Sequence, residues 1–314
     1  KAFAEKFEQD SIEFSEDDLR SLRDIFDNVR DTEATALGAK IGAILMLDGY
    51  VYKNGKVIRQ KVRLSESYLC KTLDSENSTW PDAADKTPDI PWVGAKYEII
   101  LKTNITRGAK RKREDGTQSR GPRKFLLLLG VESSPRVQMI NEYSYWGPPR
   151  RQQDLHARGA ELVYHDYVSQ DLERVIQNIS ATSKPFAKRR SPALLNTLSR
   201  NWQRLYAPVS KVPSAHKAIK YYYPKGNITA AWLNTLKDKR WVAEGKGETV
   251  LPHEAVLRTP ETQTLYQTFI CGVNAKDINY DFLNALGIIT DVRIGDLLNR
   301  LETLRDSLGT VEPE

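Results

Sequence analysis

The residue types that carry most enzyme chemistry are few and dispersed in this sequence. Four histidines are present, at His156, His165, His216 and His253. His165 is followed directly by Asp166, and a metal or nuclease site built there needs further carboxylates, for which Glu161 and Asp171 are the nearest candidates. Polar residues on a helix surface are the more ordinary interpretation, so a hydrolase or nuclease is the least favoured hypothesis.

Sequence patterns that bind nucleotides or activate a nucleophile do not occur. There is no Walker A pattern, no dinucleotide-binding glycine pattern and no G-x-S-x-G. The two cysteines, Cys70 and Cys271, have no histidine at metal-ligand spacing. The sequence therefore predicts no catalytic residue, no metal and no cofactor in this chain.

A basic run over residues 102–124 is the sharpest charge feature. Its nine lysines and arginines face only Glu114 and Asp115, and its glycines and Pro122 indicate a flexible loop. The loop is either solvated or an arm that contacts nucleic-acid phosphates. The candidate phosphate contacts are Arg107, Lys110, Arg111, Lys112, Arg113, Arg120, Arg123 and Lys124. The same hypothesis includes Lys188, Arg189 and Arg190, and a wing at 244–248 (EGKGE) like that of a winged helix.

The stretch around which the chain is organised occurs twice. FLLLLGVESSPRV (125–137) and FLNALGIITDVRI (282–294) both fit F-L-x-x-L-G-[VI]-x-[ST]-x-x-R-[VI]. The spacing predicts a short helix that ends at a glycine in the left-handed conformation. The residues that define the repeat are Phe125, Leu129, Gly130 and Arg136 in the first copy, and Phe282, Leu286, Gly287 and Arg293 in the second.

The segments before each copy also match. Asn54–Gly55 between β-prone residues predicts a hairpin, and a second glycine turn lies at 245–247. A leucine-containing segment follows each hairpin, at 62–72 and 249–259. The predicted fold class is therefore α+β and helix-rich, with two related helix–hairpin–helix units joined by a helical linker.

The predicted organisation has four parts. They are an acidic helical segment (1–36), a first repeat unit (37–145) with the basic insertion 102–124, a linker with a helix (146–192), and a second repeat unit (193–314) with a C-terminal helix. Ser15 is the expected N-cap of the first helix, and a second helix is expected over 35–47. A later helix is expected to begin at Pro192, after which IKYYYPKGN (219–227) reads as a tyrosine-rich loop.

Composition limits the class of protein. The chain has 314 residues, a net charge of +6 and a pI near 9.1, which mildly favours an anionic partner. No apolar run approaches the roughly 20 residues of a membrane helix, and no signal peptide is present, so a cytoplasmic protein without a membrane partner is expected. The absence of an initial methionine suggests a fragment of a longer chain.

A family resemblance rests on two stretches. WPDAADKTPDIPWVGAKYEIIL with RKFLLLLGVESSPRV, and WVAEGKGETVLPHEAVLRTPE with FLNALGIITDVRIGDLLNRLETL, resemble the region downstream of the ATPase module in prokaryotic sacsin-like proteins and in the plant NO VEIN family. The resemblance covers roughly residues 40–310. It implies a non-catalytic middle or C-terminal region of a GHKL-type ATPase protein, which relays nucleotide state to a partner or effector, including in anti-phage defence. Its partners would be the upstream ATPase domain or another protein, with nucleic acid as the alternative.

Overall fold

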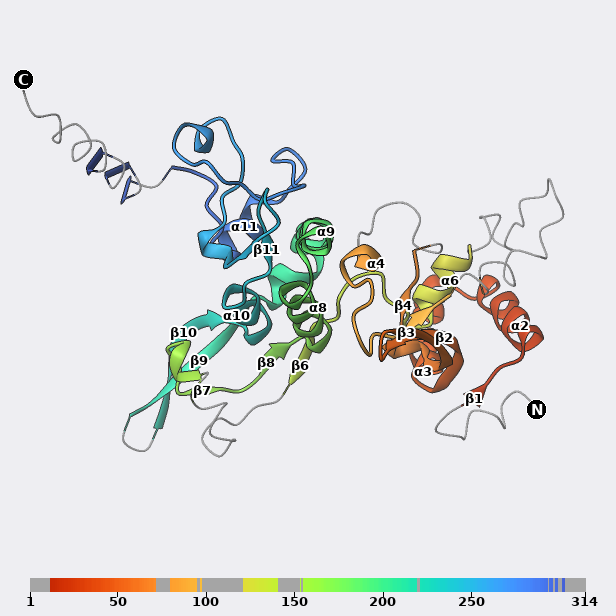
Figure 1. The fold of residues 1–314 in the computed structure, drawn as a ribbon. Helices are drawn as coiled ribbons and strands as arrows, with labels where there is room; N and C mark the ends of the chain where they lie inside the picture. The colour runs from red at the N-terminus through yellow and green to blue at the C-terminus, as the bar shows by residue number, and fades with distance from the viewer. Residues whose placement is uncertain are drawn as a thin grey trace, which may run out of the picture. The chain divides into compact units, whose positions relative to one another are not determined.

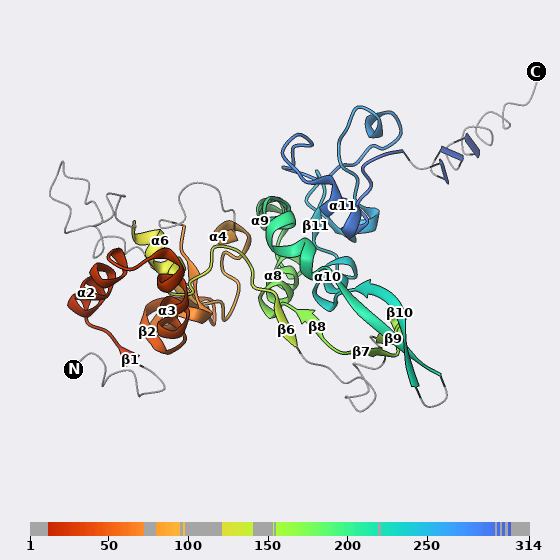
Figure 2. The same ribbon diagram turned by 180° about the vertical axis from the view of Figure 1, so that it is seen from behind.

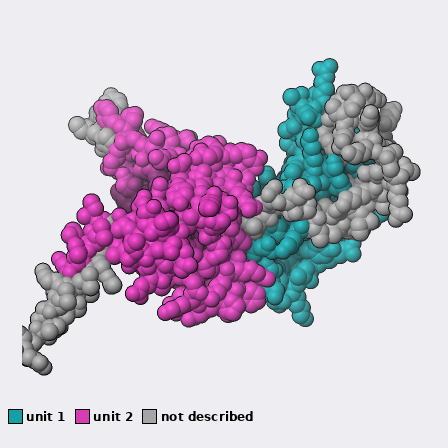
Figure 3. Space-filling model, turned by 90° about the horizontal axis from the view of Figure 1, so that it is seen from above, with its two compact units in different colours: residues 1–135 teal, residues 136–314 magenta. Residues whose placement is uncertain are grey.

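A computed structural model shows two compact units, residues 1–135 and 136–314 (Figure 3). Both mix helices with strands, which confirms the α+β class (Figure 1). The structure describes residues 12–71, 80–94, 97, 121–140, 153, 155–218, 221–292, 294–295, 297–298 and 301–302.

Helix α2 (Glu16–Asp27) is the first helix in the described part of the first unit. The Ser15 hydroxyl accepts a bond from the Asp18 backbone N–H at 3.1 Å, and the Asp18 carboxylate accepts one from the Ser15 N–H at 3.0 Å. This reciprocal capping box confirms the predicted start of the helix. The helix buries its apolar side, which carries Leu19, Leu22 and Phe26.

Helix α3 (Asp31–Ile44) begins and ends earlier than the predicted 35–47. Residues 45–47, predicted as the last turn of the helix, are instead the start of strand β2 (Leu45–Lys53), because their backbone pairs with strands on both sides in the sheet of the first unit. Gly38 and Gly42 on α3 lie against backbone carbonyls at the end of α6 (Pro122–Leu128). A side chain at either glycine would meet that backbone, so the two helices can approach this closely only without a Cβ.

The sheet of the first unit is built around β2. It pairs in parallel with β1 (Ile12–Glu13) and antiparallel with β3 (Lys56–Arg63) and β5 (Trp92–Val93), which in turn pairs with β4 (Tyr68–Leu69). The turn between β2 and β3 has two residues, Asn54 and Gly55, with φ of 49° and 79°. Positive φ at both positions is typical of the tightest hairpin turns, and the predicted hairpin is confirmed.

Aromatic residues close the irregular part of the first unit. Trp80, at the start of α4 (Trp80–Ala83), is fully buried, with its ring centroid 5.4 Å from Tyr68 and 6.4 Å from Trp92. These contacts hold the proline-containing segment against β4 and β5.

In the second unit, α8 (Gln170–Ala181) is followed by α9 (Lys184–Asn201). The prediction that this helix begins at Pro192 is wrong, because Pro185 occupies the first turn and Pro192 lies inside. A proline inside a helix leaves the carbonyl four residues earlier without its donor. That carbonyl belongs to Lys188, and the Cys271 thiol donates to it at 3.6 Å.

The tyrosine-rich segment is also different from the prediction. Residues Tyr221–Thr229 form strand β10, which pairs with β9 (Lys211–Ala218) in a ribbon that extends from the helices (Figure 2). Tyrosine favours strands, and Pro224 is tolerated because β10 is at the edge of its sheet and the register shifts between Pro224 and Gly226.

Short elements complete the second unit. They are β6 (Gln138–Ile140) with β8 (Asp166–Val168), β7 (Leu162–Val163) beside β9, α10 (Ala231–Lys237), β11 (Val242–Ala243) with β12 (Thr249–Val250), and α11 (Tyr280–Leu286). The glycine turn predicted at 245–247 joins β11 to β12, so this hairpin is confirmed as well.

Candidate functional site

The predicted basic arm lies mostly outside the described residues. Arg107, Lys110, Arg111, Lys112, Arg113 and Arg120 are in that part of the chain. Arg123 and Lys124 form the first turn of α6, where Lys124 is exposed and Arg123 is partly buried. Binding of nucleic acid by this run stays a prediction.

The His165–Asp166 pair has a structural role. Asp166 is fully buried, and its carboxylate accepts bonds from Arg158 Nη2 at 2.6 Å and from the backbone N–H of Tyr167 and Ala231 at 2.7 and 3.0 Å. The carboxylate therefore neutralises a buried guanidinium and holds the first residue of α10. Within the described ranges, no three His, Cys, Asp or Glu side chains gather as a metal site would require.

The first Phe-Leu-Gly turn ends α6 through two backbone bonds. Gly130 has φ of 83°, and its N–H donates to the Leu127 carbonyl at 3.1 Å. The next N–H, of Val131, reaches back to Leu126 at 3.1 Å. The left-handed glycine thus caps the helix and reverses the chain.

The second turn repeats this geometry at α11. Gly287 has φ of 85° and donates to Asn284 at 3.0 Å, and Ile288 donates to Leu283 at 3.0 Å. The donor–acceptor spacings are the same as in the first turn, position by position.

The chain after Gly130 pairs with the segment that follows β3. Glu132 donates to Ser67 at 3.0 Å and accepts from Leu69 at 2.9 Å. A Cβ built on Gly130 would lie 3.5 Å from Ser65, the middle residue of the 3-10 turn Leu64–Glu66. Residues 126–132, which contain the glycine turn, are therefore packed and hydrogen-bonded against residues 65–69, the segment that follows the hairpin. We call this arrangement the clamp.

The chain after Gly287 makes the same clamp. Ile289 donates to Ala255 at 2.9 Å and accepts from Leu257 at 2.8 Å. A Cβ on Gly287 would lie 3.6 Å from His253, again the middle residue of a 3-10 turn, Pro252–Glu254.

A further extended segment pairs with each hairpin at matching positions, as strand β5 in the first unit and as an isolated bridge in the second. In the first unit Val93 pairs with Gly49 of β2, and in the second Ile270 pairs with Glu244 after β11. Ile270 also donates to the Val256 carbonyl at 2.9 Å, in the place where β5 pairs with β4.

The phenylalanine at the start of each repeat copy packs its clamp against an aromatic ring on or just after a preceding helix. Phe125 meets Phe26 of α2 with ring centroids 5.6 Å apart, and Phe282 meets Trp202, just after α9, at 5.2 Å. Of the two repeat arginines, Arg136 is partly buried and Arg293 lies outside the described residues.

The hairpin of the first unit carries a charged face that the sequence reasoning missed. Arg59 and Lys61 on β3 contact Asp48 on β2 at 2.6 and 3.4 Å, and Lys61 also contacts Glu13 at 3.2 Å. The hydrogen bond from Arg59 holds the pKa of Asp48 below its ordinary value. The signal was present in the sequence, because KVIRQKVR has four cations and no acid.

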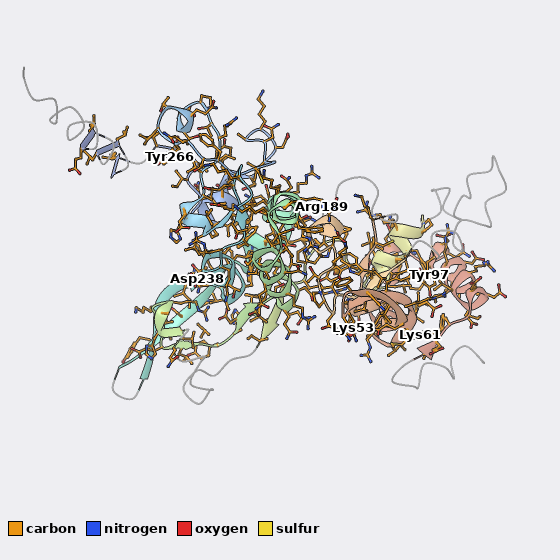
Figure 4. All side chains as sticks on the ribbon, viewed as in Figure 1. Lys53, Lys61, Tyr97, Arg189, Asp238 and Tyr266 are labelled. Atoms are coloured by element: carbon orange, nitrogen blue, oxygen red, sulfur yellow. The ribbon has the colours of Figure 1, made fainter. Side chains whose placement is uncertain are left out.

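An open cavity of about 390 Å³ lies beside this strand. Its hairpin lining includes Lys53, Gln60, Lys61 and Arg63, and Glu66 and Asp89 contribute carboxylates. Figure 4 labels Lys53 and Lys61, which both come from this hairpin. The pairs Lys53–Asp89 and Arg63–Glu66 on the lining are each 3.8 Å apart, which is long for an ion pair.

The hairpin of the second unit is covered by α9. Lys184 contacts Glu248 at 2.9 Å, and a Cβ on Gly247 would lie 3.0 Å from both Lys184 and Lys188. The expected wing at 244–248 is therefore packed against the basic segment of α9. Arg190, at 2% exposure, bonds to Asn178 at 2.8 Å and faces the interior, whereas Lys188 and Arg189 are exposed.

Both cysteines are free thiols. None of the helices in the described part of the chain is long and apolar enough to span a membrane. Comparison with protein-family models, with curated proteins and with solved structures gives no match.

Proposed function

We propose that residues 31–132 and 231–289 are two copies of one structural module, here called the first and second module. Each runs from a helix through a hairpin, a 3-10 turn and a paired extended segment to a short helix that ends at a left-handed glycine. The observation that carries the proposal is the matched set of backbone bonds at Gly130 and Gly287, which includes the clamp onto the post-hairpin segment.

The function this arrangement supports best is that of a non-catalytic interaction region. A rigid clamp between a hairpin and a helix end transmits displacement from one to the other, because packed elements move together rather than deform. Through its resemblance to sacsin-like proteins, the chain would relay the nucleotide state of a GHKL-type ATPase domain to a partner or effector, including in anti-phage defence.

Calorimetric titration of the purified chain with Mg-ATP tests the non-catalytic part. We expect no heat of binding, and micromolar affinity would overturn the proposal. Hydrogen exchange of the chain fused to a GHKL-type ATPase domain of the kind that the resemblance implies tests the relay. Exchange at the clamp residues 65–69 and 126–132 should change when a non-hydrolysable ATP analogue is added, and identical exchange in both states would exclude a relay.

A second candidate, nucleic-acid binding by residues 102–124, is favoured by the excess of nine cations over two acids in that run. If the run neutralises several phosphates, affinity for DNA falls steeply as salt is raised. A gel-shift titration should show this slope, and replacing Arg111, Lys112 and Arg113 by glutamine should reduce it. No shift at low salt would end this candidate.

A further inference from the structure

We infer that the free edge of strand β3 is a docking site for an extended, acidic segment of a partner protein, which adds to the sheet as a further strand. The inference rests on the proposed function in one respect, since it identifies the surface through which a partner would be engaged.

The two-residue turn fixes which backbone groups of β3 point outward. Lys53 and Lys56 close the hairpin as a bonded pair, so bonded pairs recur at every second position along β3. The residues between them, Val57, Arg59 and Lys61, direct N–H and C=O away from β2. None of these groups has a hydrogen-bond partner within the described residues.

The opposite edge of the hairpin shows that the assignment is correct. Asp48 and Tyr52 on β2 lie across from Lys61 and Val57. Their backbone N–H and C=O groups must therefore also point away from the partner strand, β3. The Asp48 N–H donates to the Tyr97 hydroxyl at 2.7 Å, and the Tyr52 carbonyl accepts from Asp89 at 3.2 Å. Outward groups of β2 thus have partners at Asp48 and Tyr52, whereas those of Val57, Arg59 and Lys61 on β3 have none in the described part of the chain.

The cavity provides room for side chains of an added strand. Gln60, Lys61, Val62 and Arg63 of the edge strand β3 line this cavity of about 390 Å³ together with Met46, Val51 and Lys53 of β2. In β-strand addition, main-chain bonds supply affinity and a pocket beside the edge selects alternate side chains. The edge and cavity together meet both requirements.

The charges of β3 define the partner. The strand has Lys56, Arg59, Lys61 and Arg63 and no acidic residue, and at its outer end Val57 is 67% exposed. Arg59, Lys61 and Arg63 form solvent-exposed ion pairs with Asp48 and Glu66. A carboxylate of the partner can take the place of Asp48 or Glu66 in these pairs at small cost. An extended segment with alternating acidic and apolar residues is complementary, whereas a basic segment or a second copy of β3 is repelled.

The second module lacks this opening. Its edge strand β12 has only two residues, and the outward carbonyl of Thr249 accepts a bond from Arg240 Nε at 3.3 Å. Arg240 is also held by Glu254 at 3.3 Å. Among the described residues, the outer edge is therefore long and without a backbone partner in the first module, and short and capped by Arg240 in the second.

The test uses the full 314-residue chain and a phage-displayed library of random peptides as the probe. We expect selected peptides to alternate acidic and apolar residues and to lack proline at their centre. Adding a selected peptide should slow hydrogen exchange at the amides of Val57, Arg59 and Lys61, and leave exchange at Ser67 and Leu69 unchanged.

A matched pair of variants separates backbone pairing from side-chain contacts. Lys61→Pro removes an outward N–H and keeps every bond between β2 and β3, because prolines are accepted at edge positions that face solvent. Lys61→Thr loses the same side chain and keeps the N–H. The proline variant should bind selected peptides at least about tenfold more weakly than the threonine variant.

Equal binding by the two variants would overturn the inference, as would failure to select any peptide or selection of basic ones. Self-association that Lys61→Pro abolishes would assign the edge to a second copy instead, and displacement of peptide by an oligonucleotide would assign it to nucleic acid. If Lys61→Pro does not fold, the exchange measurement on the unmodified chain decides alone. Because this test contains no nucleotide, its failure is distinct from failure of the relay.

Discussion

The hairpins of the two modules occupy the same place beside a glycine turn, but they differ in length and in what packs against them. In the first, β2 and β3 extend over nine and eight residues, and the outer edge has no partner within the described ranges. In the second, β11 and β12 have two residues each, and the turn packs on α9. The comparison indicates that the clamp is the shared structural element, while the hairpin is free to become either a buried support or an exposed edge.

The largest expected effect concerns Asp166, which anchors the start of α10 in the second module. Asp166→Ala removes the carboxylate that contacts the buried Arg158 guanidinium at 2.6 Å, so we expect a loss of about 3–5 kcal/mol in the free energy of unfolding. Asp48→Ala, which breaks the exposed pairs of the first hairpin, should cost about 1 kcal/mol or less. Urea titration measures both, and equal losses would contradict the distinction.

Next in size is the effect of a side chain at the two capping glycines. Gly130→Ala and Gly287→Ala each force a non-glycine residue into the left-handed region, at about 1–2 kcal/mol. Neither new Cβ approaches another atom closer than 3.5 Å, so strain alone should set the cost and the two losses should agree. A loss confined to one site would show that the two turns are not equivalent.

The turns of the two hairpins should respond differently. Gly55→Ala and Gly247→Ala both place alanine at positive φ, but Gly55 has open space around it, whereas Gly247 lies against Lys184 and Lys188. We expect Gly247→Ala to be more destabilising by about 1 kcal/mol, a cost typical of mild overpacking. Thermal unfolding of the two variants measures the difference, and a larger effect at Gly55 would contradict the cover by α9.

The smallest expected effect is a difference in pH dependence. The Asp48 pKa is lowered in the folded chain, so its contribution is present above the unfolded pKa and is lost as pH falls through the folded pKa. Burial raises the pKa of Glu244 in the second hairpin, so its effect has the opposite sign and stability falls as pH rises through that pKa. Urea titrations over a series of acidic pH values should show that Asp48→Asn flattens the acid loss of stability. The same titrations should show that Glu244→Gln removes the opposing change. A steeper acid loss in Asp48→Asn would reverse the assignment.

Local chemistry explains which parts of the fold could be predicted. The capping box at Ser15, the Asn54–Gly55 turn and the left-handed glycines each depend on a few adjacent residues. The early start of α9 and strand β10 could not be predicted in this way, because Pro192 and Pro224 are usually read as breaks. Pro192 is tolerated because Cys271, distant in sequence, satisfies the freed carbonyl.

The candidate site was harder to predict, for a physical reason. The cations of β3 are visible in the sequence, but an open edge is a property of the whole sheet. It depends on β1, β5 and Tyr97 all pairing with the far side of β2. No local pattern reports which side of a hairpin its neighbours occupy.

Amide hydrogen exchange of the native chain, resolved by residue, tests the central claim most directly. Shared clamps predict slow exchange at Val131 and Glu132, and equally at Ile288 and Ile289. The same experiment should show protected amides at Ile58 and Gln60 and rapid exchange at Arg59 and Lys61, where the edge is open. Protection at the first clamp with free exchange at the second, or uniform protection along β3, would contradict the account.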